Sequence, residues 1–345
     1  MPPFPPLFFL KWLCMKQFYL FIFFWGLGPW LYGQDVHFSQ FDRSFWTASP
    51  AETGAFDGRY RANLQLREQW SAVPVAYQSL GLGWEQKEAF AGFHWGLYLQ
   101  ADQAGDLGMG QSFLRLSLAR TETLSPNWSI HIGGYLGGGQ RFLNYKGASF
   151  DEQFQGDQFD PSWPLQEPAL ATAQSFLFSD LGAGLALNYR GKNWQLKWGL
   201  GLFHLNQPKQ SFLGEDDRYL PIRQLHYIQL AYGWGQKWKA QTALQFQEQG
   251  PYREWSSSQL FFYALDQRPG RELSLYTGLS WRYQDSWQPR LGIQYQNNWE
   301  LGLSYDVNYS AFQPATLGQG GFELLFVYIW RPLPKFPSKK NCPIL

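Results

Sequence analysis

Charged residues and cysteines are both scarce in this chain of 345 residues. Aspartate, glutamate, lysine and arginine make up 16% of the sequence, against about a quarter in ordinary soluble domains. The formal net charge is +1 and no basic stripe stands out, so nucleic acid is not an expected partner. If Cys14 leaves with an export leader, Cys342 is the one remaining thiol and no disulfide can form within the chain.

Long apolar runs are missing beyond residue 33, so we expect no membrane-spanning helix in the mature chain. Residues 15–33 have a basic start at Lys16, an apolar run to Leu31 and a small residue at Gly33, which is typical of a signal peptide. We therefore predict that residues 1–33 are removed, with Met15 as the true start of translation. A transmembrane anchor is the alternative, but the apolar run is short and contains Gly and Pro near its end.

Motifs for catalysis, metals and cofactors are absent as well. No His-x-His or His-Glu-x-x-His pair occurs among the five histidines, and there is no cluster of cysteines. A Gly-x-Ser-x-Gly nucleophile elbow is missing too. The sequence therefore predicts a protein that is not an enzyme and that needs no cofactor or metal.

Aromatic residues, in contrast, are abundant at 19%, with 18 Trp, 19 Tyr and 29 Phe. Aromatic side chains favour strands, and Trp and Tyr collect where hydrocarbon meets water. From Arg59 onward the chain alternates apolar and polar residues in segments of about ten residues, which is the pattern of a transmembrane barrel. In residues 59–67 the three arginines share one face, and a dry sandwich core would not accommodate them unpaired.

The sequence thus predicts an all-β fold, a transmembrane antiparallel β-barrel with long loops on one side. We expect about fourteen strands, an even number as in bacterial single-chain barrels, at residues 59–70, 74–86, 89–101, 110–120, 127–142, 180–190, 194–205, 223–234, 237–248, 257–266, 273–283, 288–297, 299–309 and 320–331. The barrel would occupy residues 59–331, after an N-terminal segment at 34–58 and before a proline-rich C-terminal tail at 332–345. In the strand at 299–309, Leu303 should face lipid and Ser304 the lumen, so arginine should be costly at Leu303 and tolerated at Ser304.

Several blocks of the sequence resemble the PorP/SprF family of outer-membrane proteins, which is associated with type IX secretion and gliding motility. They follow one another in the family's order over the mature chain: 34–41 (QDVHFSQF), 49–54 (SPAETG), 67–70 (REQW), 102–105 (DQAG), 150–156 (FDEQFQG), 159–161 (FDP), 204–208 (HLNQP), 210–214 (QSFLG), 304–308 (SYDVN), 320–323 (GGFE) and 342–343 (CP).

The resemblance implies a barrel in the outer membrane that performs no chemistry. Its partners would be membrane lipid and either a secreted type IX cargo or adhesin, which it anchors at the cell surface, or other components of the secretion apparatus. From the residues alone, a porin or a FadL-like channel for small or hydrophobic solutes remains the alternative.

The family blocks concentrate in and beside long connections, which makes those connections candidate sites. One interpretation is that the loop at 204–214 folds into the lumen as a plug, with its turns set by Asn206, Pro208 and Gly214, which follow His204, and with Phe212 buried. The other is that the loops bind a secreted protein through aromatic anchors, which would be Phe150, Phe154, Phe159 and Phe212.

Overall fold

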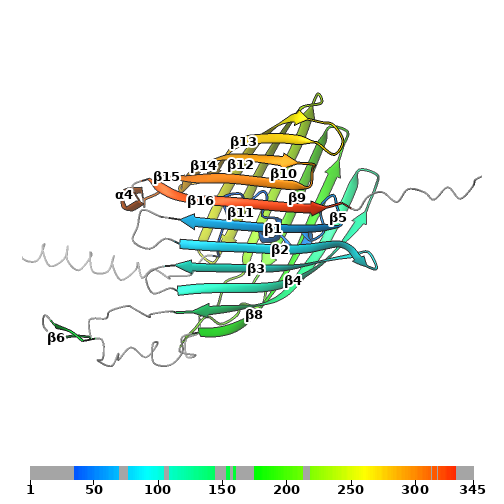
Figure 1. Cartoon of the computed structure of the whole chain (residues 1–345). Helices are drawn as coiled ribbons and strands as arrows, with labels where there is room; N and C mark the ends of the chain where they lie inside the picture. The colour runs from blue at the N-terminus through cyan, green and yellow to red at the C-terminus, as the bar shows by residue number, and fades with distance from the viewer. Residues whose placement is uncertain are drawn as a thin grey trace, which may run out of the picture. The chain divides into compact units, whose positions relative to one another are not determined.

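Fourteen antiparallel strands close into one barrel (Figure 1). The computed structural model describes residues 35–69, 77–104, 109–143, 153–155, 158–160, 175–212, 218–311, 313–316 and 318–331. Each barrel strand pairs with its sequence neighbours and β1 closes the barrel against β16, while a two-stranded hairpin of β6 and β7 lies between β5 and β8 in the chain.

The strands are β1 (Tyr60–Gln69), β2 (Tyr77–Phe90), β3 (Phe93–Ala104), β4 (Met109–Thr123), β5 (Trp128–Phe142), β6 (Phe154–Gln155), β7 (Gln158–Phe159), β8 (Ser175–Arg190), β9 (Trp194–Phe203), β10 (Arg223–Trp234), β11 (Trp238–Gln249), β12 (Tyr252–Asp266), β13 (Leu273–Arg282), β14 (Ser286–Tyr295), β15 (Trp299–Asn308) and β16 (Gln319–Trp330). Short helical turns are α2 (Phe45–Ala48), η1 (Pro50–Glu52) and α4 (Gln313–Thr316). None of the helices in the described ranges is long and apolar enough to cross a bilayer.

The predicted fold class and strand number are confirmed. The largest differences are at two strand starts, because β8 begins at Ser175 instead of residue 180 and β12 at Tyr252 instead of residue 257. The first of these starts has the sequence Ser-Phe-Leu-Phe, in which three apolar residues in a row hide the alternation that marks a half-buried strand.

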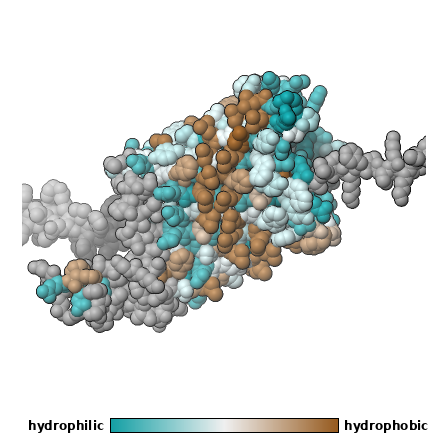
Figure 2. All heavy atoms as spheres, in the orientation of Figure 1, coloured by the Kyte–Doolittle hydropathy of each residue, from teal (hydrophilic) through white to brown (hydrophobic). Residues whose placement is uncertain are grey.

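The two faces of the strands differ as expected. In β15 the side chains of Trp299, Leu301, Leu303, Tyr305 and Val307 are exposed on the outer surface, and the residues between them point inward. Figure 2 shows apolar residues gathered in a band across the strands, with more hydrophilic residues to either side. Aromatic side chains stack along both margins of the barrel wall, for example Trp234 on Trp238 near one end and Trp281 on Trp287 near the other. This outer surface is that of a barrel that spans a membrane.

The two ends of the barrel differ in the length of their connections. At one end, called the short-turn end, the turns at 91–92, 124–127, 191–193, 235–237 and 296–298 join neighbouring strands, and β1 starts and β16 ends there. At the opposite end, called the long-loop end, lie the connections 143–174 and 204–222. In bacterial barrels short turns face the periplasm and long loops face the outside.

The lumen is not an open polar channel at mid-height. Ser304 is only 3% exposed and lies beside Arg290 on the neighbouring strand, whereas Leu303 is 38% exposed. The predicted facing of both residues is therefore confirmed, but the expected tolerance of arginine at Ser304 does not follow, because the space inside is already occupied.

Arginine in place of Leu303 should lower the free energy of unfolding by roughly 2–4 kcal/mol, because it places a charge in the apolar band. Urea unfolding in phospholipid vesicles, followed by tryptophan fluorescence, measures this change. The matched control is Gln195→Arg, at an inward-facing position that borders a cavity. Equal losses for both variants would contradict the assigned facing of the strands.

Candidate functional site

Residues 35–57 fold inside the barrel and fill the middle of its lumen. This segment, called the plug, is buried along most of its length and contains α2 and η1. It starts at the long-loop end, where Asp35 contacts Gln249, and runs to the short-turn end, where the carbonyl of Phe56 accepts a hydrogen bond from Lys87. The chain then turns into β1.

Local sequence explains how the plug turns inside such a narrow space. The Ser49 hydroxyl accepts a hydrogen bond from the backbone N–H of Ala51, and Pro50 starts η1 without a donor to satisfy. Gly54 has φ +76°, and a Cβ at this position would collide with the ring of His94. Only glycine fits such a backbone at such close approach.

Glycines in the barrel wall let the plug lie directly against the strands. An ideal Cβ on Gly201 of β9 would meet the carbonyl of Ala48, and one on Gly184 of β8 would meet the side chain of Ser49. The Ser49 hydroxyl donates to the backbone carbonyl of Leu200 at 2.8 Å, which joins η1 to β9. The wall is therefore shaped for this segment.

A buried charged cluster holds the start of the plug at the long-loop end. His204, just after β9, lies between two carboxylates, with Nε2 2.8 Å from Asp35 Oδ2 and Nδ1 2.8 Å from Asp180 Oδ1. Arg223 lies 3.5 Å from Asp35 and Arg115 lies 3.1 Å from Asp180. Since ionised carboxylates only accept hydrogen bonds, both ring nitrogens of His204 must donate, and the ring is an imidazolium.

Electrostatics in this cluster outweigh burial. Burial alone would lower the pKa of His204, but Asp35 and Asp180 raise it above the ordinary value. Burial would likewise raise the pKa of Asp35, but His204 and Arg223 hold it far below the ordinary value. Asp35, at the start of the plug, therefore belongs to a network in which positively and negatively charged side chains alternate.

A second group of contacts holds the middle of the plug. The backbone N–H groups of Ser39 and Gln40 donate to the two oxygens of Glu323, at 2.6 and 3.0 Å. Each oxygen of this carboxylate therefore accepts a hydrogen bond from the plug. The Ser39 hydroxyl donates to Asp306, at 2.6 Å. Asp42 forms a fully buried ion pair with Arg290, so a wall arginine finds its carboxylate on the plug.

A third group holds the end of the plug. Glu52 accepts from Lys197 at 2.5 Å and from the Tyr227 hydroxyl. Burial would raise the pKa of Glu52, but Lys197 lowers it below the ordinary value. The Thr53 hydroxyl lies 2.7 Å from that of Ser117, and the N–H of Gly54 donates to Glu85 at 3.2 Å.

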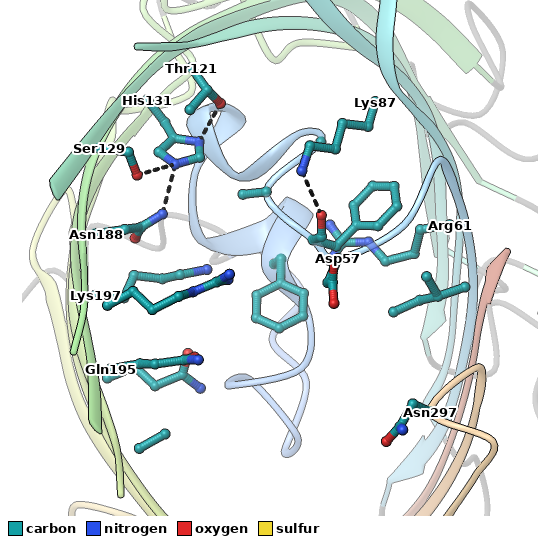
Figure 3. Close-up of a pocket in the computed structure, with 18 of the residues that line it drawn as sticks. Asp57, Arg61, Lys87, Thr121, Ser129, His131, Asn188, Gln195, Lys197 and Asn297 are labelled. Atoms are coloured by element: carbon teal, nitrogen blue, oxygen red, sulfur yellow. Dashed lines mark hydrogen bonds between the residues drawn. The ribbon is translucent and has the colours of Figure 1, made fainter. Parts of the chain in front are cut away.

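Between the plug and the short-turn end lies a polar cavity of about 1100 Å³, called the vestibule (Figure 3). On one wall His131 contacts Thr121 at 2.9 Å, Asn188 at 2.8 Å and Ser129 at 3.3 Å. Lys197 lies farther along the same wall, and Lys87 faces it from the other side. The described residues hold no group of His, Cys, Asp or Glu arranged to bind a metal ion.

The residues singled out from the sequence have different places in this arrangement. Within the loop 204–214, His204 belongs to the buried cluster, while Asn206 is exposed and bonds to the main chain of β8. The carbonyl of Pro208 accepts from Leu220 at 2.9 Å, and the Phe212 ring contacts Phe176 at 4.9 Å between centroids.

Phe154 and Phe159 face each other across the β6–β7 hairpin with ring centroids 5.1 Å apart, and both are exposed. Phe150 and Gly214 lie outside the described residues. The middle of the lumen is thus filled by residues 35–57, for which the sequence patterns indicated no structure. In the described part of the loop 204–214, His204 bonds to that segment through Asp35.

One signal in the sequence could have revealed the plug. Wall cations such as Arg223, Arg290 and Lys197 face inward from strands and each needs a buried carboxylate. Their partners Asp35, Asp42 and Glu52 are all placed before the first strand.

Comparison with known proteins gives one family and a set of barrels. The sequence model described as "Type IX secretion system membrane protein PorP/SprF" matches residues 31–328. Similar solved structures include the Pseudomonas putida toluene transporter TodX, with 10% identity, a TM-score of 0.46, and coverage of 83% of this chain and 92% of that one. The KdgM porin is 8% identical, with a TM-score of 0.39 and coverage of 79% of this chain and 99% of that one. Likeness at this level concerns the fold alone. No curated protein matches the sequence.

Raising the pH should loosen the start of the plug. A raised pKa means that the contribution of His204 to stability is complete below the ordinary imidazole value of about 6.5 and is lost as the pH rises through the raised value. A cysteine in place of Val36, a half-buried residue next to Asp35, should therefore react with a thiol reagent faster at alkaline pH, after correction for the reagent's own pH dependence. His204→Gln should remove this extra pH dependence, and an unchanged profile in that variant would contradict the role of the imidazolium.

Proposed function

Because the chain belongs to the PorP/SprF family of type IX secretion system membrane proteins, we propose that it holds a secreted protein at the cell surface and does not conduct solutes. The barrel is a protein of the outer membrane, and its long-loop end, facing outward, would carry the partner. The family is described more widely as membrane proteins of the type IX secretion system. The proposal therefore also covers a partner that is another component of the secretion apparatus.

The observation that carries the proposal is the plug. Residues 35–57 cross the lumen and bond to strands on several sides of the wall, through Glu323 of β16, Arg290 of β14 and Lys197 of β9. A pore for solutes needs a continuous water-filled path. A barrel filled by its own N-terminal segment instead offers a rigid platform with two different ends.

The β6–β7 hairpin supports an anchoring role at the long-loop end. It presents two exposed phenylalanines, Phe154 and Phe159, within the longest connection between strands. Aromatic residues, phenylalanine among them, are enriched in the cores of protein interfaces. Phe150, from the same connection, is part of this proposal by sequence.

A porin or a FadL-like channel for small or hydrophobic solutes is the second candidate. The vestibule is the observation that favours a channel, because it is a polar cavity inside the barrel at the short-turn end. Phe45 and Gly54 of the plug form part of its lining, so the plug closes the inner side of this cavity.

Conductance separates the two candidates. The purified protein in planar bilayers should give no stable conductance, and deletion of residues 35–57 should open steps in single-channel recordings, because water then replaces the plug. Steps of the same size in the full-length protein would contradict a closed lumen.

Removal of the segment Phe154–Phe159 should leave a barrel whose migration on gels still changes on heating, because the hairpin contributes nothing to the barrel sheet. The surface protein held by this barrel should then appear in the culture medium. The proteins that leave the surface when the whole chain is deleted identify that partner. If the hairpin deletion keeps the partner on the cells, the hairpin is not the anchor.

A further inference from the structure

Strand β8 extends beyond its neighbour on one side. It pairs with β5 from Ser175 to Tyr189, but its pairing with β9 starts only at Ala183. At the long-loop end, residues 175–182 therefore pair with β5 on one side, and on the β9 side no strand among the described residues pairs with them. An edge of this kind exposes main-chain donors and acceptors in the pattern that another strand would recognise.

The register shows which main-chain groups point to the open side. The N–H of Leu181 donates to the Asn206 side chain at 3.1 Å, and its carbonyl accepts from Leu205 at 2.9 Å. Both groups of one residue in an antiparallel strand point to the same neighbour, and this direction alternates along the strand. Since the β5–β8 register is continuous, the main chains of Ser175 and Leu177 point away from β5 as well.

Asn206 marks where the covered part of this edge ends. Its side-chain amide donates to the carbonyl of Ser179 at 2.9 Å and accepts from Leu181, as the main chain of another strand would. Beyond that point, no hydrogen bond to the main chain of Ser175 or Leu177 on the β9 side exists within the part of the chain that the structure describes. Since Asn206 covers the carbonyl of Ser179, the open stretch is Ser175–Phe178.

This open edge lies beyond the apolar band of the barrel. Leu181 faces outward in line with Leu136 of β5 and Leu116 of β4, whereas Leu177 is in line with Gln140 of β5 and Ser112 of β4. The outward side chains therefore change from apolar to polar between these two levels. Leu177 is nonetheless 80% exposed, so an apolar side chain projects from the barrel wall in line with these polar side chains.

The inward face of the same stretch is aromatic. The Phe178 ring packs edge-on against Phe113 at 5.4 Å, and Phe176 packs against Phe212 at 4.9 Å. These ring contacts fix the position of the part of β8 that extends beyond β9, called the overhang, beside the buried cluster of His204. The edge is therefore preorganised, although no strand among the described residues pairs with it on the β9 side.

We propose that the edge Ser175–Phe178 of β8 binds an extended segment of the secreted partner as an additional strand. This inference rests on the proposed anchoring function and names its contact. Natural proteins guard open edges with lysine, proline, inward charges or bulges, and residues 175–179, Ser-Phe-Leu-Phe-Ser, contain none of these. An incoming strand would pair with the main chain of Leu177 and cover its side chain, a mode of recognition used by many peptide-binding sheets.

Leu177→Pro tests the pairing, because it removes an N–H that points away from β5 and leaves the β5–β8 ladder intact. Leu177→Ala is the matched control, because it keeps the main chain and removes only the side chain. The amount of the partner that stays on cells should fall about tenfold in Leu177→Pro, for the loss of one or two main-chain hydrogen bonds, and less in Leu177→Ala. The partner is the protein that leaves the surface when the whole chain is deleted.

Heat-dependent migration on gels confirms first that each variant forms a barrel. Equal retention in Leu177→Pro and wild type, or equal losses in both variants, overturns the strand pairing while the anchoring function stands. If deletion of the whole chain releases no surface protein, the anchoring function itself fails.

Hydrogen exchange provides a second and independent measurement. In the purified barrel the amide of Leu177 should exchange quickly, and addition of the purified released protein should slow it at least tenfold, because pairing closes the exposed amide. Slow exchange without any partner would mean that the chain's own residues or a second copy cover the edge, and this would overturn the proposal.

Discussion

Neutralisation of charge inside a narrow, water-poor lumen is the constraint on which the rest of this structure depends. Strand arginines that face inward cannot remain buried without anions, because an unpaired buried charge costs several kcal/mol. Arg61 of β1 pairs with Glu85 on the adjacent strand β2, and Arg115 of β4 pairs with Asp180 of β8, which lies on the far side of β5. Arg223, Arg290 and Lys197 instead pair with the N-terminal segment. The wall and the plug are therefore two halves of one electrostatic arrangement.

This arrangement explains why the plug lies in one position and not in another. Buried ion pairs contribute little net stability over well-packed apolar contacts, but removal of one partner is costly. A plug that slid along the lumen would separate Asp42 from Arg290 and Glu52 from Lys197 at the same time. Wall glycines at 184 and 201 add a steric limit, since the segment 48–51 fits against them and not against the larger side chains nearby. The position of the plug in the lumen thus follows from its ion pairs and from its steric fit to the wall together.

The sequence alone predicted the barrel better than it predicted the site. Strands such as β15 and β1 alternate strictly, and that local period of two is readable from a single segment. The plug has no such period, because residues 35–57 mix short turns and its contacts reach wall residues up to 284 positions away. The start of β8 was missed for a related reason, since Phe176 and Phe178 face inward against rings that are distant in sequence, while the apolar Leu177 faces outward and is exposed. Both features depend on neighbours distant in sequence.

The two features that local patterns do not show are also the two on which the proposed function and the proposed strand pairing rest. In the proposed function the lumen conducts no solutes, and the specificity of the barrel resides on its surfaces. Its outer band needs only to be apolar, so specificity there is low. The overhang of β8 differs, because it is held by packed rings on one side and by Asn206 at its lower end, yet leaves the main chain of Leu177 open. A rigid lumen supports this arrangement: His204 is bonded to Asp180 of β8 and to Asp35 of the plug, so the base of the overhang is fixed by the same charges that close the barrel.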